Sequence, residues 1–192
     1  MSTENIAHFF LKNPMLYWTY QGLVGGHKAR RWFIEKDVKP QANQKLLDIG
    51  CGPGNIIKYL PKVEYLGVDV DEKYIEAAKR RYGDKGDFIC TKIEDFDVPD
   101  PGTFDIVFAS GILHHLDDGQ AKAFFEVASK ALKPRGRLVT IDGCFIERQH
   151  PISKFLLNSD RGEHIRTMPA YEALAKTSFN TIESELKHNY FN

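Results

Sequence analysis

The feature that most constrains the fold is a glycine-rich turn directly after a short apolar segment. Residues 45–49 are mostly aliphatic, and they lead into three glycines at alternate positions, Gly50, Gly52 and Gly54. A buried parallel strand that ends in a glycine turn lets the backbone approach a nucleotide-like ligand closely, because glycine has no side chain and tolerates left-handed backbone. The segment therefore predicts an α/β fold with a ligand site at the end of its first strand.

A second strand-like segment, residues 64–69, ends in a carboxylate. Asp69 follows Gly54 by fifteen residues. In a nucleotide-binding βαβ unit, the acidic residue at the end of the second strand accepts hydrogen bonds from the ribose hydroxyls. The two segments together indicate a ligand that contains a ribose.

The spacing of the glycines distinguishes between classes of ribose-containing ligand. Dinucleotide enzymes place them as G-x-G-x-x-G, whereas here the third glycine comes early, at Gly54, and position 55 is Asn. Asp48, two residues before the first glycine, would repel a pyrophosphate but suits a ligand that carries an amino group and a sulfonium. A nicotinamide-dependent Rossmann oxidoreductase is therefore the less favoured alternative.

Strand-like and helix-like segments alternate along the chain. The predicted strands are 45–49, 64–69, 87–91, 104–110, 137–142 and 181–190, and the predicted helices are 27–38, 55–60, 71–82, 118–132 and 169–178. This alternation predicts an α/β fold with a doubly wound, mostly parallel sheet and helices on both faces.

The composition argues against several classes of protein. The chain has 26 basic and 26 acidic residues, so no net field draws it to nucleic acid or to an anionic membrane. No stretch approaches the roughly 20 apolar residues of a membrane span, and the first ten residues lack a signal-peptide pattern. Three widely spaced cysteines fit neither a disulfide framework nor a zinc site. We expect a cytoplasmic protein that binds no nucleic acid, no membrane and no metal.

On these motifs the chain resembles the class I S-adenosylmethionine-dependent methyltransferases of the small-molecule type. The resemblance is carried by residues 46–54, 67–69, 104–116 and 134–138, and it extends over residues 26–190. It implies a Rossmann-like fold, S-adenosylmethionine as the methyl donor and S-adenosylhomocysteine as the product. It also implies a small-molecule acceptor, and it leaves open whether oxygen, nitrogen or carbon receives the methyl group.

The resemblance implies roles for the residues at the ends of the strands. The backbone of Gly50–Gly52 would contact the methionine part of the cofactor, and Asp48 would hold its amino group or a water. Asp69 would accept both ribose hydroxyls. Ser110 and Gly111 would line the methionine side, where the acceptor enters. The complete predicted cofactor set is Asp48, Gly50, Cys51, Gly52, Gly54, Asp69, Val70, Ile93, Ser110 and Gly111.

The predicted adenine pocket departs from the family pattern at one position. Val70 would pack on the adenine, and Ile93 would offer its backbone N–H to adenine N1. The family often has an Asp after the third strand that accepts a hydrogen bond from the adenine amino group. Lys92 stands there and can only donate, so Glu94 is the nearest side chain that can take this role.

Two adjacent histidines after the fourth strand are the best candidates for a catalytic base. A base is needed only if the acceptor must lose a proton, as a phenol or an amine does. Neighbouring residues in a helical turn point about 100° apart, so at most one should face the acceptor, and we favour His114 over His115. Asp142, at the end of the fifth strand, is the other candidate, although it can also act only as a cap.

We expect one methyltransferase domain over residues 1–192. It comprises an N-terminal helical cover (1–25), a cofactor-binding core (26–142), and an acceptor-side loop, helix and sixth strand (143–192). The family sheet also has an antiparallel seventh strand, for which no sequence remains. We therefore expect six strands, with a homodimer or an exposed sheet edge. Because this strand is missing, a second interpretation of the function remains: a catalytically impaired or non-catalytic S-adenosylmethionine-binding module that acts with a partner.

Overall fold

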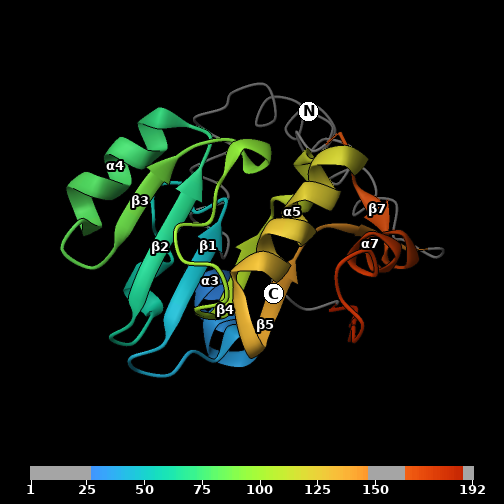
Figure 1. Ribbon diagram of the computed structural model, residues 1–192, viewed down its shortest axis with the longest axis horizontal. Helices are drawn as coiled ribbons and strands as arrows, with labels where there is room; N and C mark the ends of the chain where they lie inside the picture. Colours follow the sequence, from blue (N-terminus) through green and yellow to red (C-terminus); the bar gives the residue numbers. More distant parts are fainter. Residues whose placement is uncertain (1–26, 147–162, 188–192) are drawn as a thin grey trace, which may run out of the picture.

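The computed structural model describes residues 27–146 and 163–187 and is built around a five-stranded parallel sheet (Figure 1). The strands are β1 (Lys45–Ile49), β2 (Glu64–Asp69), β3 (Asp87–Cys90), β4 (Phe104–Ser110) and β5 (Leu132–Ile141), in the spatial order β3-β2-β1-β4-β5. All neighbouring pairs are parallel, so all five strands end at the same edge. The chain leaves β1 toward β2 on one side and returns as β4 on the other, which places a topological switch point beside β1.

Helices cover both faces of this sheet (Figure 1). One face packs against α5 (Asp118–Ala131), with α7 (Met168–Ala175) beside it. The other packs against α4 (Glu72–Tyr82) and the π-helix η2 (Phe33–Val38), which continues α3 (His27–Trp32). Side chains of β1 alternate between the two cores, because successive strand residues point to opposite faces. The predicted doubly wound α/β fold is confirmed.

Short elements join the larger ones. They are the 3-10 turns η3 (Ile57–Tyr59), η4 (Ile93–Asp95) and η5 (Leu113–His115), and the strands β6 (Cys144–Phe145) and β7 (Arg166–Thr167), which pair in parallel. The helix predicted over 55–60 is only the turn η3, because Pro61 ends it and β2 begins three residues later.

The sixth strand predicted over residues 181–190 is wrong for the part that the structure describes. Residues 181–187 form no regular element and no ladder with the sheet. Side-chain contacts hold the end of this segment instead, because the Lys187 ammonium pairs with Asp37 and lies 4.8 Å from the centroid of the Trp32 ring. Within the described residues β5 pairs only with β4. The homodimer expected to cover such an edge stays a prediction.

Several predicted segments lie outside the described residues. They are the helical cover over 1–25, residues 147–162 of the predicted acceptor-side region, and the last residues of the predicted sixth strand. Among the helices that the structure does describe, none is long and apolar enough to cross a membrane.

The start of α4 provides a test of the fold. The Asp71 carboxylate accepts hydrogen bonds from the backbone N–H groups of Lys73 and Tyr74. Asp71→Ala should lower the free energy of unfolding by about 1 kcal/mol, because these two N–H groups lose their acceptor. Asp71→Ser should lose less, since serine also caps. Glu76→Ala, on the exposed face of α4, is the control and should change it by less than about 0.5 kcal/mol. Urea unfolding followed by circular dichroism measures all three, and equal losses at positions 71 and 76 would contradict the cap.

Candidate functional site

The glycine turn has the backbone that the sequence predicts. Gly50, Gly52 and Gly54 have φ angles of +78°, +54° and +72°, which favour glycine. A Cβ on Gly50 would lie 2.5 Å from Ile112 Cδ1, and one on Gly54 would lie 3.2 Å from the Phe88 ring. A Cβ on Gly52, by contrast, would meet no atom within 4 Å. The turn is therefore packed at its two ends and open at Gly52, where the backbone is accessible to a ligand.

Asp69 joins this turn to the end of β2. Its Oδ2 accepts a hydrogen bond from the Gly52 N–H at 2.8 Å, and its Oδ1 accepts one from the Asp71 N–H at 2.9 Å. Each carboxylate oxygen keeps a further lone pair, so both can still accept a hydroxyl. The next side chain, Val70, is 64% exposed although it is apolar. A held carboxylate beside an exposed apolar side chain suits a ribose with a flat apolar base attached.

Asp48 has a partner that the sequence analysis missed. The Tyr65 hydroxyl donates a hydrogen bond to Asp48 Oδ2 at 2.6 Å, and both side chains are buried on the η2 side of the sheet. Burial raises the pKa of Asp48 to about 7, although the Tyr65 hydrogen bond opposes the shift. A tyrosine within the predicted buried strand 64–69 was the available signal, because a buried phenol needs a polar partner. The predicted contact of Asp48 with a ligand stays a prediction.

The structure brings His114 and Asp142 together and places His115 outside them. His114 Nδ1 lies 2.8 Å from Asp142 Oδ1, and the His114 backbone N–H donates to the same oxygen at 3.2 Å. The two side chains are only 9% and 5% exposed. His115 is exposed, and its ring centroid lies 4.2 Å from that of His114. The preference for His114 over His115 thus has a structural basis in this buried pair, and its catalytic role stays a prediction.

The pair is buried and lies close to the end of β4. Burial raises the pKa of Asp142, while its hydrogen bonds from His114 act in the opposite direction. Asp142 Oδ2 is buried and has no hydrogen-bond partner in the described part of the chain. A Cβ on Gly111 would lie 3.6 Å from His114 Cε1, so the imidazole lies beside the predicted methionine side of the site. Within residues 27–146 and 163–187, no three His, Cys, Asp or Glu side chains gather as metal ligands.

The remaining predicted cofactor residues divide into exposed and buried ones. Ser110 and Gly111 are exposed at the end of β4, and the Gly111 N–H donates to the Ile141 carbonyl at 2.8 Å. The side chains of Cys51 and Ile93 are buried in the two cores. These two residues can therefore offer a ligand only their backbone.

On the predicted adenine side, the carboxylate of Glu94 is partly engaged. Its Oε1 accepts a hydrogen bond from Gln120 Nε2 at 2.8 Å, which links η4 to the start of α5. Lys92 precedes η4 and is exposed. The second carboxylate oxygen of Glu94 has room to accept a hydrogen bond, since only one of the two oxygens is held by Gln120.

An open parallel sheet with a glycine turn and a ribose-type carboxylate at its carboxyl edge defines a Rossmann-like domain for a nucleoside-type cofactor. The model of the methyltransferase domain family matches residues 47–140, from β1 through most of β5. This match and the methyltransferase relatives support a class I S-adenosylmethionine-dependent methyltransferase.

Individual relatives are distant. N-terminal Xaa-Pro-Lys N-methyltransferase 1 of Mus musculus is 27% identical over 157 residues, which are 69% of this chain and 70% of that protein. Ubiquinone biosynthesis O-methyltransferase of Idiomarina loihiensis is 29% identical over 142 residues, 71% of this chain and 56% of that protein. The structure of Haemonchus contortus phosphoethanolamine N-methyltransferase 2 with S-adenosyl-L-methionine gives a TM-score of 0.68 at 20% identity, over 93% of this chain and 44% of that one. At this identity the likeness shows the fold.

The buried Asp48 predicts a pH dependence of stability. Its folded-state pKa of about 7 lies above the value of about 4 in an unfolded chain, so the folded state binds more protons between these two values. Stability should therefore fall as the pH rises through this window. Asp48→Asn removes the titrating carboxyl group but keeps an oxygen that can accept from Tyr65. Between pH 5 and pH 8, the free energy of unfolding of this variant should therefore rise by about 2–3 kcal/mol relative to that of the wild type.

Urea unfolding at the two pH values measures this effect. Asp84→Asn, at an exposed carboxylate after α4, is the control and should leave the pH dependence unchanged. Parallel pH dependences in the wild type and Asp48→Asn would show that Asp48 does not titrate in this range.

Proposed function

We propose that this methyltransferase acts on a small-molecule acceptor whose hydroxyl or amine loses its proton to His114. The observation that carries the proposal is the buried hydrogen bond between His114 Nδ1 and Asp142, next to the end of β4. When bound, S-adenosylmethionine supplies a methyl group on a sulfonium that is already a good leaving group. The protein then has to align the acceptor, remove its proton and exclude water.

The pairing with Asp142 suits His114 to act as a base. A carboxylate bonded to Nδ1 holds the proton on that nitrogen, so that Nε2 is the nitrogen without a proton. The same carboxylate stabilises the imidazolium that forms when Nε2 takes up a proton. The unpartnered Asp142 Oδ2 strengthens this effect, because its charge is not shared with another donor in the described part of the chain.

The burial of the base limits what can reach it. With His114 and Asp142 almost completely enclosed, only a small nucleophilic group can approach the imidazole. A small molecule meets this requirement, and so does the amino end of an extended peptide. The Mus musculus relative, named for action on Xaa-Pro-Lys amino termini, makes the peptide amine the second candidate. A panel of phenols, small amines and Xaa-Pro-Lys peptides with radiolabelled methyl donor separates the two. Turnover of peptides alone would overturn the small-molecule proposal.

For the cofactor we assign Asp69 to the ribose and the open side of Gly52 to the methionine part. The two hydrogen bonds that Asp69 accepts from backbone leave each of its oxygens a further lone pair for a hydroxyl. The same bond to Gly52 holds the turn against the carboxylate. Val70 would then lie under the adenine, which accounts for an apolar side chain left exposed at this position.

Substitutions at Asp69 and Gly52 test the cofactor assignment. Asp69→Ala should weaken S-adenosylhomocysteine binding by about 2–3 kcal/mol, because two charge-assisted hydrogen bonds are lost. Gly52→Ala should lower the free energy of unfolding by only about 1–2 kcal/mol, because alanine is strained in left-handed backbone but its Cβ meets no protein atom. It should nevertheless weaken binding, because the methyl group occupies the ligand's space.

Isothermal titration calorimetry measures both affinities. Asp87→Ala, an exposed carboxylate at the start of β3 and so at the opposite edge of the sheet, is the matched control and should bind normally. Unchanged affinity in Asp69→Ala would mean that the ribose lies elsewhere.

The base is tested with the acceptor that gives the fastest turnover in the panel. His114→Gln should lower kcat by about 10²–10⁴-fold, because the proton acceptor is gone. Affinity for S-adenosylhomocysteine should stay within about twofold, because the imidazole acts on the acceptor rather than on the cofactor. His115→Gln, at the exposed neighbour, is the matched control and should keep most of the activity. Equal losses at the two positions, or full activity of His114→Gln, would overturn the role of His114.

A further inference from the structure

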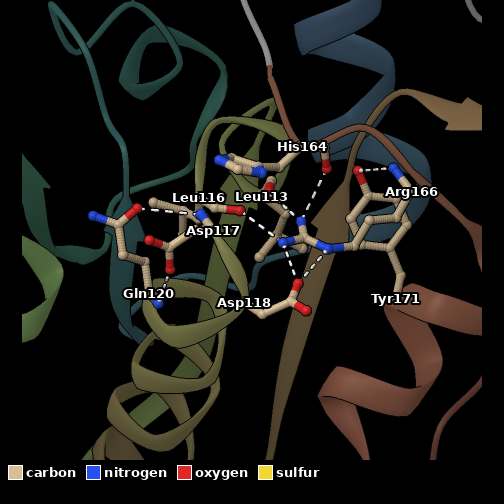
Figure 2. Close-up of polar contacts among 8 residues, drawn as sticks. All are labelled: Leu113, Leu116, Asp117, Asp118, Gln120, His164, Arg166 and Tyr171. Carbon is tan, nitrogen blue, oxygen red and sulfur yellow. Dashed lines mark hydrogen bonds and ion pairs between the residues drawn. The ribbon is translucent and has the colours of Figure 1, made fainter.

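A single arginine connects the turn that carries His114 to the segment before α7 (Figure 2). The Arg166 side chain is only 10% exposed. Its Nη1 donates to the Leu113 carbonyl at 3.0 Å and to the His164 carbonyl at 3.0 Å, and its Nη2 donates to the Leu116 carbonyl at 2.8 Å. The guanidinium also pairs with Asp118 Oδ1, with Nε at 3.1 Å and Nη2 at 2.7 Å. One guanidinium therefore holds both ends of η5 and the first residue of α5.

The turn η5 depends on these donors. It is a single 3-10 turn in which the Leu113 carbonyl accepts a long bond from the Leu116 N–H at 3.3 Å, while the His114 and Leu116 carbonyls accept none from the residues of the turn. Leu113 and Leu116 bond Arg166, and the His114 carbonyl between them accepts from the His164 N–H at 3.0 Å. Three carbonyls of this turn are thus held by residues 164–166, which lie far along the chain. The direction of the His114 side chain follows from how this turn is held.

The same arginine is tied to the strand end that carries Asp142. The Tyr171 hydroxyl donates to the Gly143 carbonyl at 3.1 Å and accepts a longer bond from the Arg166 backbone N–H at 3.4 Å. The Arg166 guanidinium carbon lies 5.8 Å from the centroid of the Tyr171 ring, a cation–π distance. Arg166 and Tyr171 together therefore connect the two elements whose side chains meet at the His114–Asp142 hydrogen bond.

We propose that Arg166 is a positioning residue for His114. It holds η5 against the end of β5, so that His114 Nδ1 stays within hydrogen-bond distance of Asp142. Lysine cannot replace it, because its compact ammonium lacks the planar fork that reaches the Leu113 and Leu116 carbonyls at once. The kinetic part of this inference rests on the proposed role of His114 as the base, whereas the structural part does not.

Arg166→Lys and Asp118→Asn form a matched pair of variants. The first keeps the charge and can keep the ion pair to Asp118, but it loses the fork that bonds the two carbonyls. The second removes the ion pair and leaves the carbonyl bonds. If Arg166 acts through the carbonyls of η5, only the first variant should disturb His114. If it acts only through the ion pair with Asp118, the second variant should show the larger loss and the first should resemble the wild type.

The direct readout is the protonation pattern of the His114 ring. Nitrogen-15 magnetic resonance of the full chain with S-adenosylhomocysteine, assigned by comparison with His114→Gln, should show the proton on Nδ1 in the wild type and in Asp118→Asn. Arg166→Lys should show a mixture of the two tautomers. This readout needs no acceptor, so it tests the positioning whether or not His114 proves to be the base. A wild-type ring pattern in Arg166→Lys would overturn the proposal.

The kinetic readout uses the acceptor from the panel, below the unfolding temperature of each variant. Arg166→Lys should lower kcat about tenfold or more with little change in S-adenosylhomocysteine affinity, because misplacement of a reacting group acts on the chemical step. Asp118→Asn should stay within about threefold of the wild type, since the carbonyl bonds remain. A loss in Asp118→Asn as large as that in Arg166→Lys, or larger, would overturn the proposal in favour of a role for the ion pair. If His114→Gln is fully active while Arg166→Lys still alters the His114 ring, the base assignment fails and the positioning stands.

Discussion

The parallel pairing of β1 with β2 on one side and β4 on the other is the constraint on which the rest of the structure depends. Because the three strands run in the same direction, the Gly50 turn, Asp69 and Ser110 all come to one edge of the sheet. Both faces of these strands are buried, so the pairing is fixed by apolar packing under α5 and under η2 and α4. The glycine turn, Asp69 and Ser110 therefore lie along the carboxyl edge of a well-packed sheet.

Three carboxylates lie at or near this edge, and the protein holds each in a different way. Asp48 is buried and bonded to a tyrosine hydroxyl, and burial raises its pKa to about 7. Asp69 is held by backbone N–H groups and keeps its outer lone pairs. Asp142 is buried against His114. The different partners suit different tasks, since a carboxylate that accepts hydroxyls must stay open to the ligand, whereas one that orients an imidazole is better enclosed.

The features confirmed from the sequence are local ones. The glycine turn was predicted because left-handed backbone leaves a direct mark on residue choice, and all three glycines have positive φ. The strands were predicted because buried parallel strands are continuously apolar. The sixth strand was predicted by the same kind of pattern and did not form over 181–187, since a strand also requires a neighbour to pair with.

The sequence by itself determined the fold class, the cofactor class and the presence of two histidines after the fourth strand. The tertiary structure decided which histidine is enclosed and which partner each carboxylate has. It also decided how Arg166 joins η5 to the segment before α7. The physical reason is the separation along the chain of the residues that set each feature. Backbone conformation and burial pattern are set by neighbouring residues, whereas a hydrogen bond between η5 and β7 exists only after the sheet and its helices have brought distant segments together.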